Sequence, residues 1–527
     1  MTAGFGFDGL LTEKMAVFSV GAVPVKRLDS LMHRVWRSVV GRGLAVVGVV
    51  ALAGCGDAPP ITFATDDRVE GLFEPAAEAF TQQMEAAFGQ PLEPVVWESL
   101  PVQMHAAAGS VKAESPDAPT RLKFSPDYEA AAVEPGAEVV FTLGPNVAAV
   151  RKVVEYDADE QILEIDAALP QPVEGEQVAI GPGALMQKAR PLYARHCQHC
   201  HGVSGDGNGP DAWSMNPKPR DFRQGKFKFT STRTFYAPHR DDLMRTLDEG
   251  IAGTYMPSFK LLPEADRRVL VEYVIWLANR GEIENQALRV LTADFGPEAI
   301  ADYREGFEED LADAREDEDA EEIAELEALG PLGELTEDWT DFEPDLPEEF
   351  TGWAEAISDR WNNAQGENAV VVPTDGRPAM SPESIAEGRA IYLSDGAKCV
   401  SCHGRQGLGN GPQTLSLQRA NDGDGYNDVP GLHDDWGNVI LPRNLQTGIF
   451  RGGRRPIDVY RRLYSGINGS KMPGFGGSLT DEQIWHVVNY LYALGEDPTL
   501  NERLDATLAA DDDDAASETP NDVAMLR

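Results

Sequence analysis

The sequence predicts a mainly α-helical protein with two similar helical domains and a small β-rich module before them. A Cys-x-x-Cys-His motif occurs twice with the same kinds of residue around it, which indicates an internal repeat. An alternating apolar pattern typical of strands precedes the first motif. At 527 residues the chain is too long for one hydrophobic core, so we expect several units.

An apolar run near the amino end has the form of an export signal. Arg34, Arg37 and Arg42 precede the apolar stretch 43–54, which is too short to span a bilayer and ends at Cys55. Residues 52–55, Leu-Ala-Gly-Cys, match a lipobox. The resemblance to bacterial lipoproteins implies that Cys55 becomes the lipid-carrying first residue of the mature protein. An ordinary buried cysteine is the alternative.

The charge balance is strongly acidic. The chain has 45 Lys and Arg against 87 Asp and Glu, a net charge of −42. Such a field disfavours nucleic acid as a direct ligand and favours protein partners with basic docking surfaces, or simple solubility.

The cysteines predict cofactor attachment. Apart from Cys55, they form two pairs, which leaves none for a disulfide framework. The first pair is Cys197 and Cys200, followed by His201; the second is Cys399 and Cys402, followed by His403. On a helix both thiols of a pair can reach the vinyl groups of one haem, and the histidine can bind its iron. A zinc knuckle or a redox dithiol is the alternative.

The repeat continues beyond the motifs. Pro-Arg recurs at Arg220 and Arg443, whose side chains pair with haem propionates or lie on the surface. Met-Pro-x-Phe recurs at Met256 and Met472, and the proline enforces an extended loop in which a thioether can reach the iron. Both methionines are therefore the predicted distal ligands. The rivals are a core-filling methionine or one of three other residues, Met215, His239 and His433.

Each predicted helical domain closes with an amphipathic helix. One spans 263–277 and the other 480–494, where Thr480 and Gln483 form a capping box. Tyr273 and Tyr490 occupy equivalent positions and should face the helices 185–193 and 384–392. Gly388 would let the second pair of helices cross closely, whereas Ala189 stands at its counterpart in the first pair.

The helix, Cys-x-x-Cys-His motif, glycine loop, Met-Pro loop and aromatic closing helix together resemble a class I cytochrome c domain, present twice. Membrane-attached dihaem cytochromes of respiratory chains are similar. The resemblance covers less than half of the chain and implies two covalently bound haem c groups. In class I cytochromes a loop proline orients the proximal imidazole with its carbonyl group. Pro210 and Pro412 are candidates for that role, with plain turn prolines as the alternative.

Three other stretches have weaker signals. The β-rich module is predicted to be a small barrel or hairpin stack that acts as a dock or a spacer. Its expected strands are 138–143, 149–156, 161–165 and 177–180. The acidic stretch 307–323 predicts a solvated helix or a disordered tether. The loop 422–428 has calcium-like oxygen spacing without a closing glutamate, so an ordinary acidic loop is favoured.

His/Met ligation leaves no open position on the iron, which predicts one-electron transfer and no catalytic residues. The expected role is electron transfer between a membrane quinol-oxidising complex and a terminal oxidase or another acceptor. The expected location is the exported, periplasmic side of the membrane, with the lipid at Cys55 as anchor. A dihaem peroxidase would need a distal position that opens, and a fixed subunit of a larger complex would use the β-rich module as its dock.

The predicted division of the chain follows from these features. Its ranges are a lipoprotein signal peptide at 1–54, a linker or helical segment at 55–119, the β-rich module at 120–181, the first cytochrome c domain at 182–283, an acidic linker at 284–380, the second cytochrome c domain at 381–498 and an acidic tail at 499–527.

Overall fold

The structure is a computed structural model, and it describes residues 61–506 apart from 98, 105–106, 116–117, 127–132, 148, 182–185 and 421–424. The chain divides into two units, Met1–Ile61 and Thr62–Arg527, and every described residue except Ile61 lies in the second. The predicted signal peptide with Cys55 and most of the acidic tail lie outside the described residues. Within the described part of the chain, no helix is both long and apolar enough to cross a bilayer.

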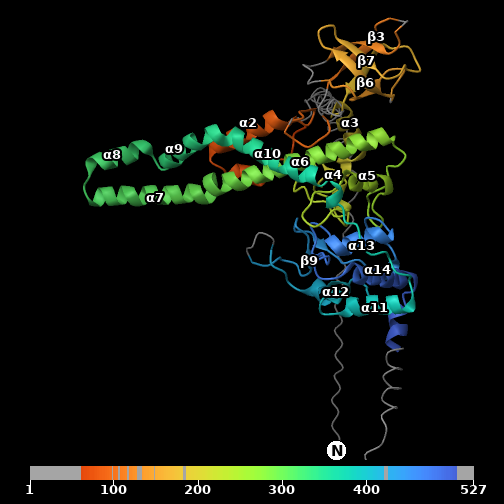
Figure 1. Cartoon of the computed structure of the whole chain (residues 1–527). Helices are drawn as coiled ribbons and strands as arrows, with labels where there is room; N and C mark the ends of the chain where they lie inside the picture. The colour runs from red at the N-terminus through yellow and green to blue at the C-terminus, as the bar shows by residue number, and fades with distance from the viewer. Residues whose placement is uncertain are drawn as a thin grey trace, which may run out of the picture. The chain divides into compact units, whose positions relative to one another are not determined.

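The β-rich module is a closed antiparallel barrel with the strand order β3-β4-β7-β6-β5-β8 (Figure 1). Its interior is apolar: Leu122 pairs with Leu163 across β4 and β7, and Phe124 and Phe141 are fully buried. The module extends beyond the predicted 120–181, because β3 has too few apolar residues to show strand alternation. The strands are β3 Ala108–Ala113, β4 Arg121–Pro126, β5 Glu138–Leu143, β6 Val150–Asp157, β7 Ile162–Ile165 and β8 Glu174–Ile180.

Two helical domains contain the cysteine motifs, which confirms the predicted fold class, mainly α with a small β-rich module. In the first domain the rings of Tyr193 and Tyr273 lie 4.9 Å apart, and in the second those of Tyr392 and Tyr490 lie 5.3 Å apart. The closing helix of each domain therefore packs on the helix before its motif, as predicted. The helices are α3 Met186–His196, α4 Gln198–His201, α5 Arg240–Glu249 and α6 Glu264–Phe295, then α11 Pro382–Leu393, α12 Cys399–His403, α13 Pro456–Ser465 and α14 Asp481–Glu496.

The second domain also contains the predicted capping box and a short hairpin. The Thr480 side chain accepts from the Gln483 N–H, and the Gln483 side chain accepts from the Thr480 N–H. The hairpin consists of β9 Leu432–His433 and β10 Val439–Ile440, which pair antiparallel.

The acidic segment between the two domains is helical, and it is not a disordered tether. Its charged side chains face solvent, whereas Leu335, Trp339 and Phe350 are buried in the core of the first domain. This hidden apolar stripe explains why the segment folds against α6 despite its like charges. Its helices are α7 Pro297–Glu316, α8 Ala320–Leu329, α9 Gly333–Phe342 and α10 Leu346–Asn363.

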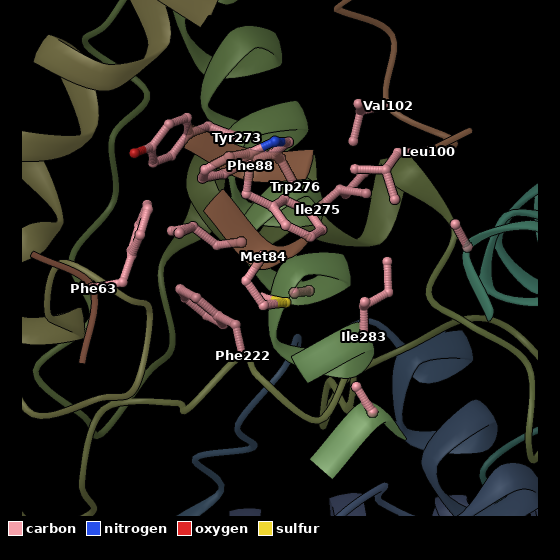
Figure 2. Packing of buried hydrophobic residues seen from close by; sticks show 14 of the residues in the cluster. Phe63, Met84, Phe88, Leu100, Val102, Phe222, Tyr273, Ile275, Trp276 and Ile283 are labelled. Atoms are coloured by element: carbon pink, nitrogen blue, oxygen red, sulfur yellow. The ribbon is translucent and has the colours of Figure 1, made fainter. Parts of the chain in front are cut away.

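The segment before the barrel joins the same core. It contains α2 Glu74–Phe88, and the strands β1 Gly89–Gln90 and β2 Glu93–Pro94 follow. Phe88 lies edge-on to Trp276 with 5.8 Å between ring centroids, and Phe80 lies 6.4 Å from Phe350. Figure 2 shows Phe63, Phe88 and Trp276 clustered in this core. The α6 helix is longer than the predicted 263–277 because its apolar stripe continues here.

The second domain depends on a glycine where α11 crosses α14. A Cβ at Gly388 would lie 2.0 Å from the His486 carbonyl oxygen and 2.9 Å from the Tyr490 Cβ. The close crossing predicted at Gly388 is therefore present, and only a residue without a side chain allows it.

We predict that Gly388→Ala destabilises the second domain by about 1–3 kcal/mol, because α11 and α14 must separate to admit the methyl group. Urea unfolding followed by circular dichroism measures the loss. The matched control is Gly352→Ala in α10, where a Cβ meets nothing within 4 Å. The control should be neutral or stabilise by roughly 0.5–1 kcal/mol, and equal losses in both variants would contradict the crossing.

Candidate haem sites

Each cysteine motif is wound into a single helical turn. In the first motif the His201 N–H donates to the Cys197 carbonyl at 2.9 Å, and the Cys197 backbone N–H donates to the Tyr193 carbonyl at 2.8 Å. The second motif forms α12. The four thiols are unbridged. Burial raises the pKa of Cys197 to about 12 and that of Cys399 to about 11, so both thiols stay protonated. The structure thus brings each predicted Cys-Cys-His set onto one turn.

A buried tyrosine fixes the chain directly after each motif. The Tyr193 hydroxyl donates to the Gly202 carbonyl at 2.9 Å, and the Tyr392 hydroxyl donates to the Gly404 carbonyl at 2.6 Å. Both glycines have positive φ, +77° and +74°. The chain can therefore turn sharply behind the histidine, and the hydroxyl satisfies the carbonyl exposed by that turn.

The imidazoles of His201 and His403 are oriented by backbone carbonyl groups. Nδ1 of His201 lies 3.0 Å from the Arg220 carbonyl oxygen, and Nδ1 of His403 lies 3.1 Å from that of Arg443. Burial lowers the pKa of His201 to about 4 and lowers that of His403 as well, so both rings are neutral. A neutral ring that donates from Nδ1 keeps its Nε2 lone pair for a metal.

The prediction that Pro210 and Pro412 orient these rings is wrong. Both prolines are exposed, and the carbonyls that accept from the rings belong to Arg220 and Arg443. Glycines explain the geometry: a Cβ at Gly207 would lie 2.7 Å from the Pro219 carbonyl oxygen. At the equivalent position in the second domain, a Cβ on Gly409 would lie 2.3 Å from the Pro442 carbonyl oxygen. The glycine loop therefore lets the Pro-Arg segment approach the motif closely enough to reach the imidazole.

The two methionine loops have the same hydrogen bonds. In the first loop, the Ile251 N–H donates to the Met256 carbonyl at 3.0 Å. In the second loop, the Ile467 N–H donates to the Met472 carbonyl at 3.1 Å. A Cβ at Gly250 or Gly466 would lie 2.7 Å from the carbonyl oxygen of Met256 or Met472 respectively. The glycines before the loops thus fold each methionine back against its helix. Both methionines are half-buried, and their role as distal ligands stays a prediction.

The rival ligands lie in different environments. His239 caps α5, where its Nδ1 accepts from the Asp241 N–H at 3.2 Å. His433 is buried on β9 and donates from Nδ1 to the Gly431 carbonyl at 3.1 Å. Met215 is half-buried at the end of η3 Ala212–Ser214. Of the three, His239 has a structural task that explains it without a metal.

The donor set at each motif fits a covalently attached haem. Each site offers unbridged thiols for thioether bonds and a neutral imidazole with Nε2 available for iron. Two buried N–H groups, Trp436 Nε1 and Arg451 Nε, have no acceptor among the described residues. Such donors are what a haem carboxylate requires.

Two other groupings add no separate site. Ligand atoms of His199, Cys200 and Asp211 lie within 4.8 Å of one another, but Cys200 belongs to the first motif. The calcium-like loop 422–428 begins outside the described residues.

Comparison with known proteins identifies the class of domain at these sites. The family described as cytochrome C oxidase, cbb3-type, subunit III matches residues 184–274 and 383–491. Both regions contain a complete cysteine motif and its methionine loop. The chain therefore contains cytochrome c domains, which bind haem c covalently and transfer electrons.

The search of curated proteins found no match. Among solved structures, a chain of the Kuenenia stuttgartiensis reducing HAO-like protein complex Kustc0457/Kustc0458 is 23% identical, with a TM-score of 0.37. That alignment covers 58% of this chain and 96% of the other.

We predict that Tyr392→Phe destabilises the second domain by about 1–3 kcal/mol, because the buried Gly404 carbonyl loses its donor. Chemical unfolding of the purified protein measures the change. Tyr426→Phe is the control, since Tyr426 is 62% exposed, and it should change stability by less than about 0.5 kcal/mol. An unchanged midpoint for Tyr392→Phe would show that the hydroxyl does not support the turn behind His403.

Proposed function

We propose that the chain is a membrane-anchored dihaem c-type cytochrome that passes single electrons between redox protein partners on the exported side of the membrane. The observation that carries this proposal is the duplication of one complete site. Both domains repeat the same imidazole-to-carbonyl bond, the same tyrosine support and the same methionine loop. Each domain thus has the parts for one haem.

Haem iron would supply the one-electron chemistry, and the residues of this chain determine how it is attached and surrounded. Cys197 and Cys200, or Cys399 and Cys402, would form the thioether bonds. The Arg220 and Arg443 carbonyl oxygens keep the proton of each imidazole on Nδ1. Met256 and Met472 would supply the second iron ligand at each site, and a thioether ligand would raise the reduction potential. Such a site favours electron transfer over bond chemistry.

A fixed subunit of a larger complex is the second candidate. The matched family is described as a subunit of a cytochrome c oxidase, which supports this alternative. The barrel would then dock the cytochrome c domains to their complex. Copurification of a stable assembly from detergent extracts would favour it, whereas a free protein that exchanges electrons with soluble partners would favour the shuttle.

A dihaem peroxidase is the third candidate function. It would require one haem that frees its distal position, and Met-Pro-x-Phe in both loops disfavours this. Peroxide turnover by the reduced protein would favour the peroxidase function over electron transfer alone.

Anchoring and partner choice rest on the sequence. The lipobox at 52–55 supports a lipid on Cys55, and the net charge of −42 supports partners with basic docking surfaces. Association with such partners should weaken as salt is added, because screening shortens the range of the acidic field.

We predict that the exported protein gains the mass of two haem groups and that Cys399→Ala/Cys402→Ala gains only one. Intact-mass spectrometry under denaturing conditions measures both, since thioether bonds survive unfolding. Cys55→Ser is the matched control: it should keep both haems and lose only the membrane attachment. A wild-type protein without added haem would refute the proposed function.

We also predict that Met256→His and Met472→His each lower the reduction potential of one haem, because imidazole replaces a thioether that favours ferrous iron. Spectral redox titration resolves the two potentials. Met215→Leu should change neither. If Met215→Leu lowers a potential and Met256→His does not, Met215 is the distal ligand in the first domain.

A further inference from the structure

The two haem sites contact each other through equivalent residues. Arg220 and Arg443, whose carbonyl groups orient the proximal imidazoles, each extend a guanidinium toward the methionine loop of the other domain. A Cβ at Gly253 would lie 2.9 Å from Arg443 Nη2, and one at Gly469 would lie 3.6 Å from Arg220 Nη1. Both glycines stand three residues before a predicted ligand, Met256 or Met472.

The second domain adds an insertion to this otherwise reciprocal contact. Pro210 and Pro219 are nine positions apart in the first domain, whereas the equivalent Pro412 and Pro442 are thirty apart. The additional chain contains the β9–β10 hairpin. The Arg220 guanidinium lies 3.8 Å from the ring centroid of Trp436, which is in the turn of this hairpin.

Ion pairs attach the insertion to the first domain. Lys226 Nζ lies 2.6 Å from Asp435 Oδ2, and Lys228 Nζ lies 3.7 Å from Asp434 Oδ2. Asp434 is only 5% exposed, so its charge is poorly screened. The second domain thus places two carboxylates beside the Pro-Arg segment that orients His201.

A stack of aromatic rings extends from the first imidazole to the residue next to Lys226. His201 stacks on Phe222 with 4.7 Å between centroids, and Phe222 stacks on Phe227 at 5.8 Å. Phe227 follows Lys226 in the chain. The Lys226–Asp435 pair therefore begins one residue from this aromatic stack. Its side chains are 44% and 32% exposed, so solvent weakens the Coulomb effect of this pair on the first haem site, whereas the Asp434 carboxylate is buried.

The Pro-Arg segment of the second domain has different partners among the described residues. Its Arg443 donates from Nε to the Ile449 carbonyl of its own domain at 3.0 Å. Ile449 occupies the position equivalent to Lys226. In contrast, the Arg220 guanidinium makes no hydrogen bond among the described residues, although burial lowers its pKa to about 10.

We propose that the second domain completes the first haem site, with the hairpin residues Asp434, Asp435 and Trp436 acting as positioning residues that tune the reduction potential of the haem at Cys197 and Cys200. This inference rests on the proposed function. Reduction adds one electron to the iron and breaks no bond, so the balance between the ferric and ferrous forms responds directly to nearby charge. A carboxylate favours the ferric form and a cation favours the ferrous form.

The test breaks the Lys226–Asp435 pair from either side in the haem-loaded protein. Asp435→Asn leaves the cation and should raise the potential of the first haem, whereas Lys226→Gln leaves the carboxylate and should lower it. Spectral redox titration measures both shifts, and Met472→His assigns the second potential. A purely structural role for the pair would shift the potential in the same direction in both variants.

A matched control breaks an exposed ion pair elsewhere. Arg315 and Glu327 lie 3.1 Å apart on α7 and α8, so Glu327→Gln should move neither potential. Shifts of the same sign, or second-haem shifts as large as the first, overturn the inference. Unchanged potentials in a protein that has two haems also overturn it and leave the proposed function intact, whereas a protein without haem refutes the proposed function itself.

Discussion

The hydrogen bond from a histidine Nδ1 to an arginine carbonyl oxygen is the constraint on which each haem site depends. It fixes the tautomer of a partly buried, neutral imidazole and so leaves Nε2 as the nitrogen that can bind iron. The glycine loop serves this bond, because a side chain at Gly207 or Gly409 would push the Pro-Arg segment away. The tyrosine behind each motif supports the same turn from the other side.

The two domains share this backbone arrangement but have different surroundings. The first shares its core with α2 and with the helices of the acidic segment, so that Trp276, Phe88 and Phe350 belong to one cluster. The second has a smaller core and depends on the close crossing at Gly388. Its insertion also reaches the first domain. Duplicated sites with unequal neighbours give a physical reason for two different reduction potentials.

The sequence was informative where a side chain performs the task. The cysteine motifs, the tyrosine pairs, the capping box at Thr480 and the crossing at Gly388 were all predictable, since each depends on a residue type at a fixed spacing. The carbonyl groups that accept from the imidazoles were not predictable, because every residue has a carbonyl group and only the fold determines which one lies near the histidine. The repeated Pro-Arg pair was the available signal. From the sequence we assigned a role to the arginine side chains, whereas the structure uses the arginine carbonyl groups. The strand β3 and the buried stripe around Trp339 were hidden by polar neighbours.

In the proposed function both irons are bound on both sides and exchange only electrons. Spectral redox titration of the purified protein, followed by addition of carbon monoxide to the reduced form, tests it most directly. We expect two low-spin haems with separate potentials and no spectral change on adding carbon monoxide. Carbon monoxide binding at either iron would reveal a vacant sixth position and contradict the carrier function.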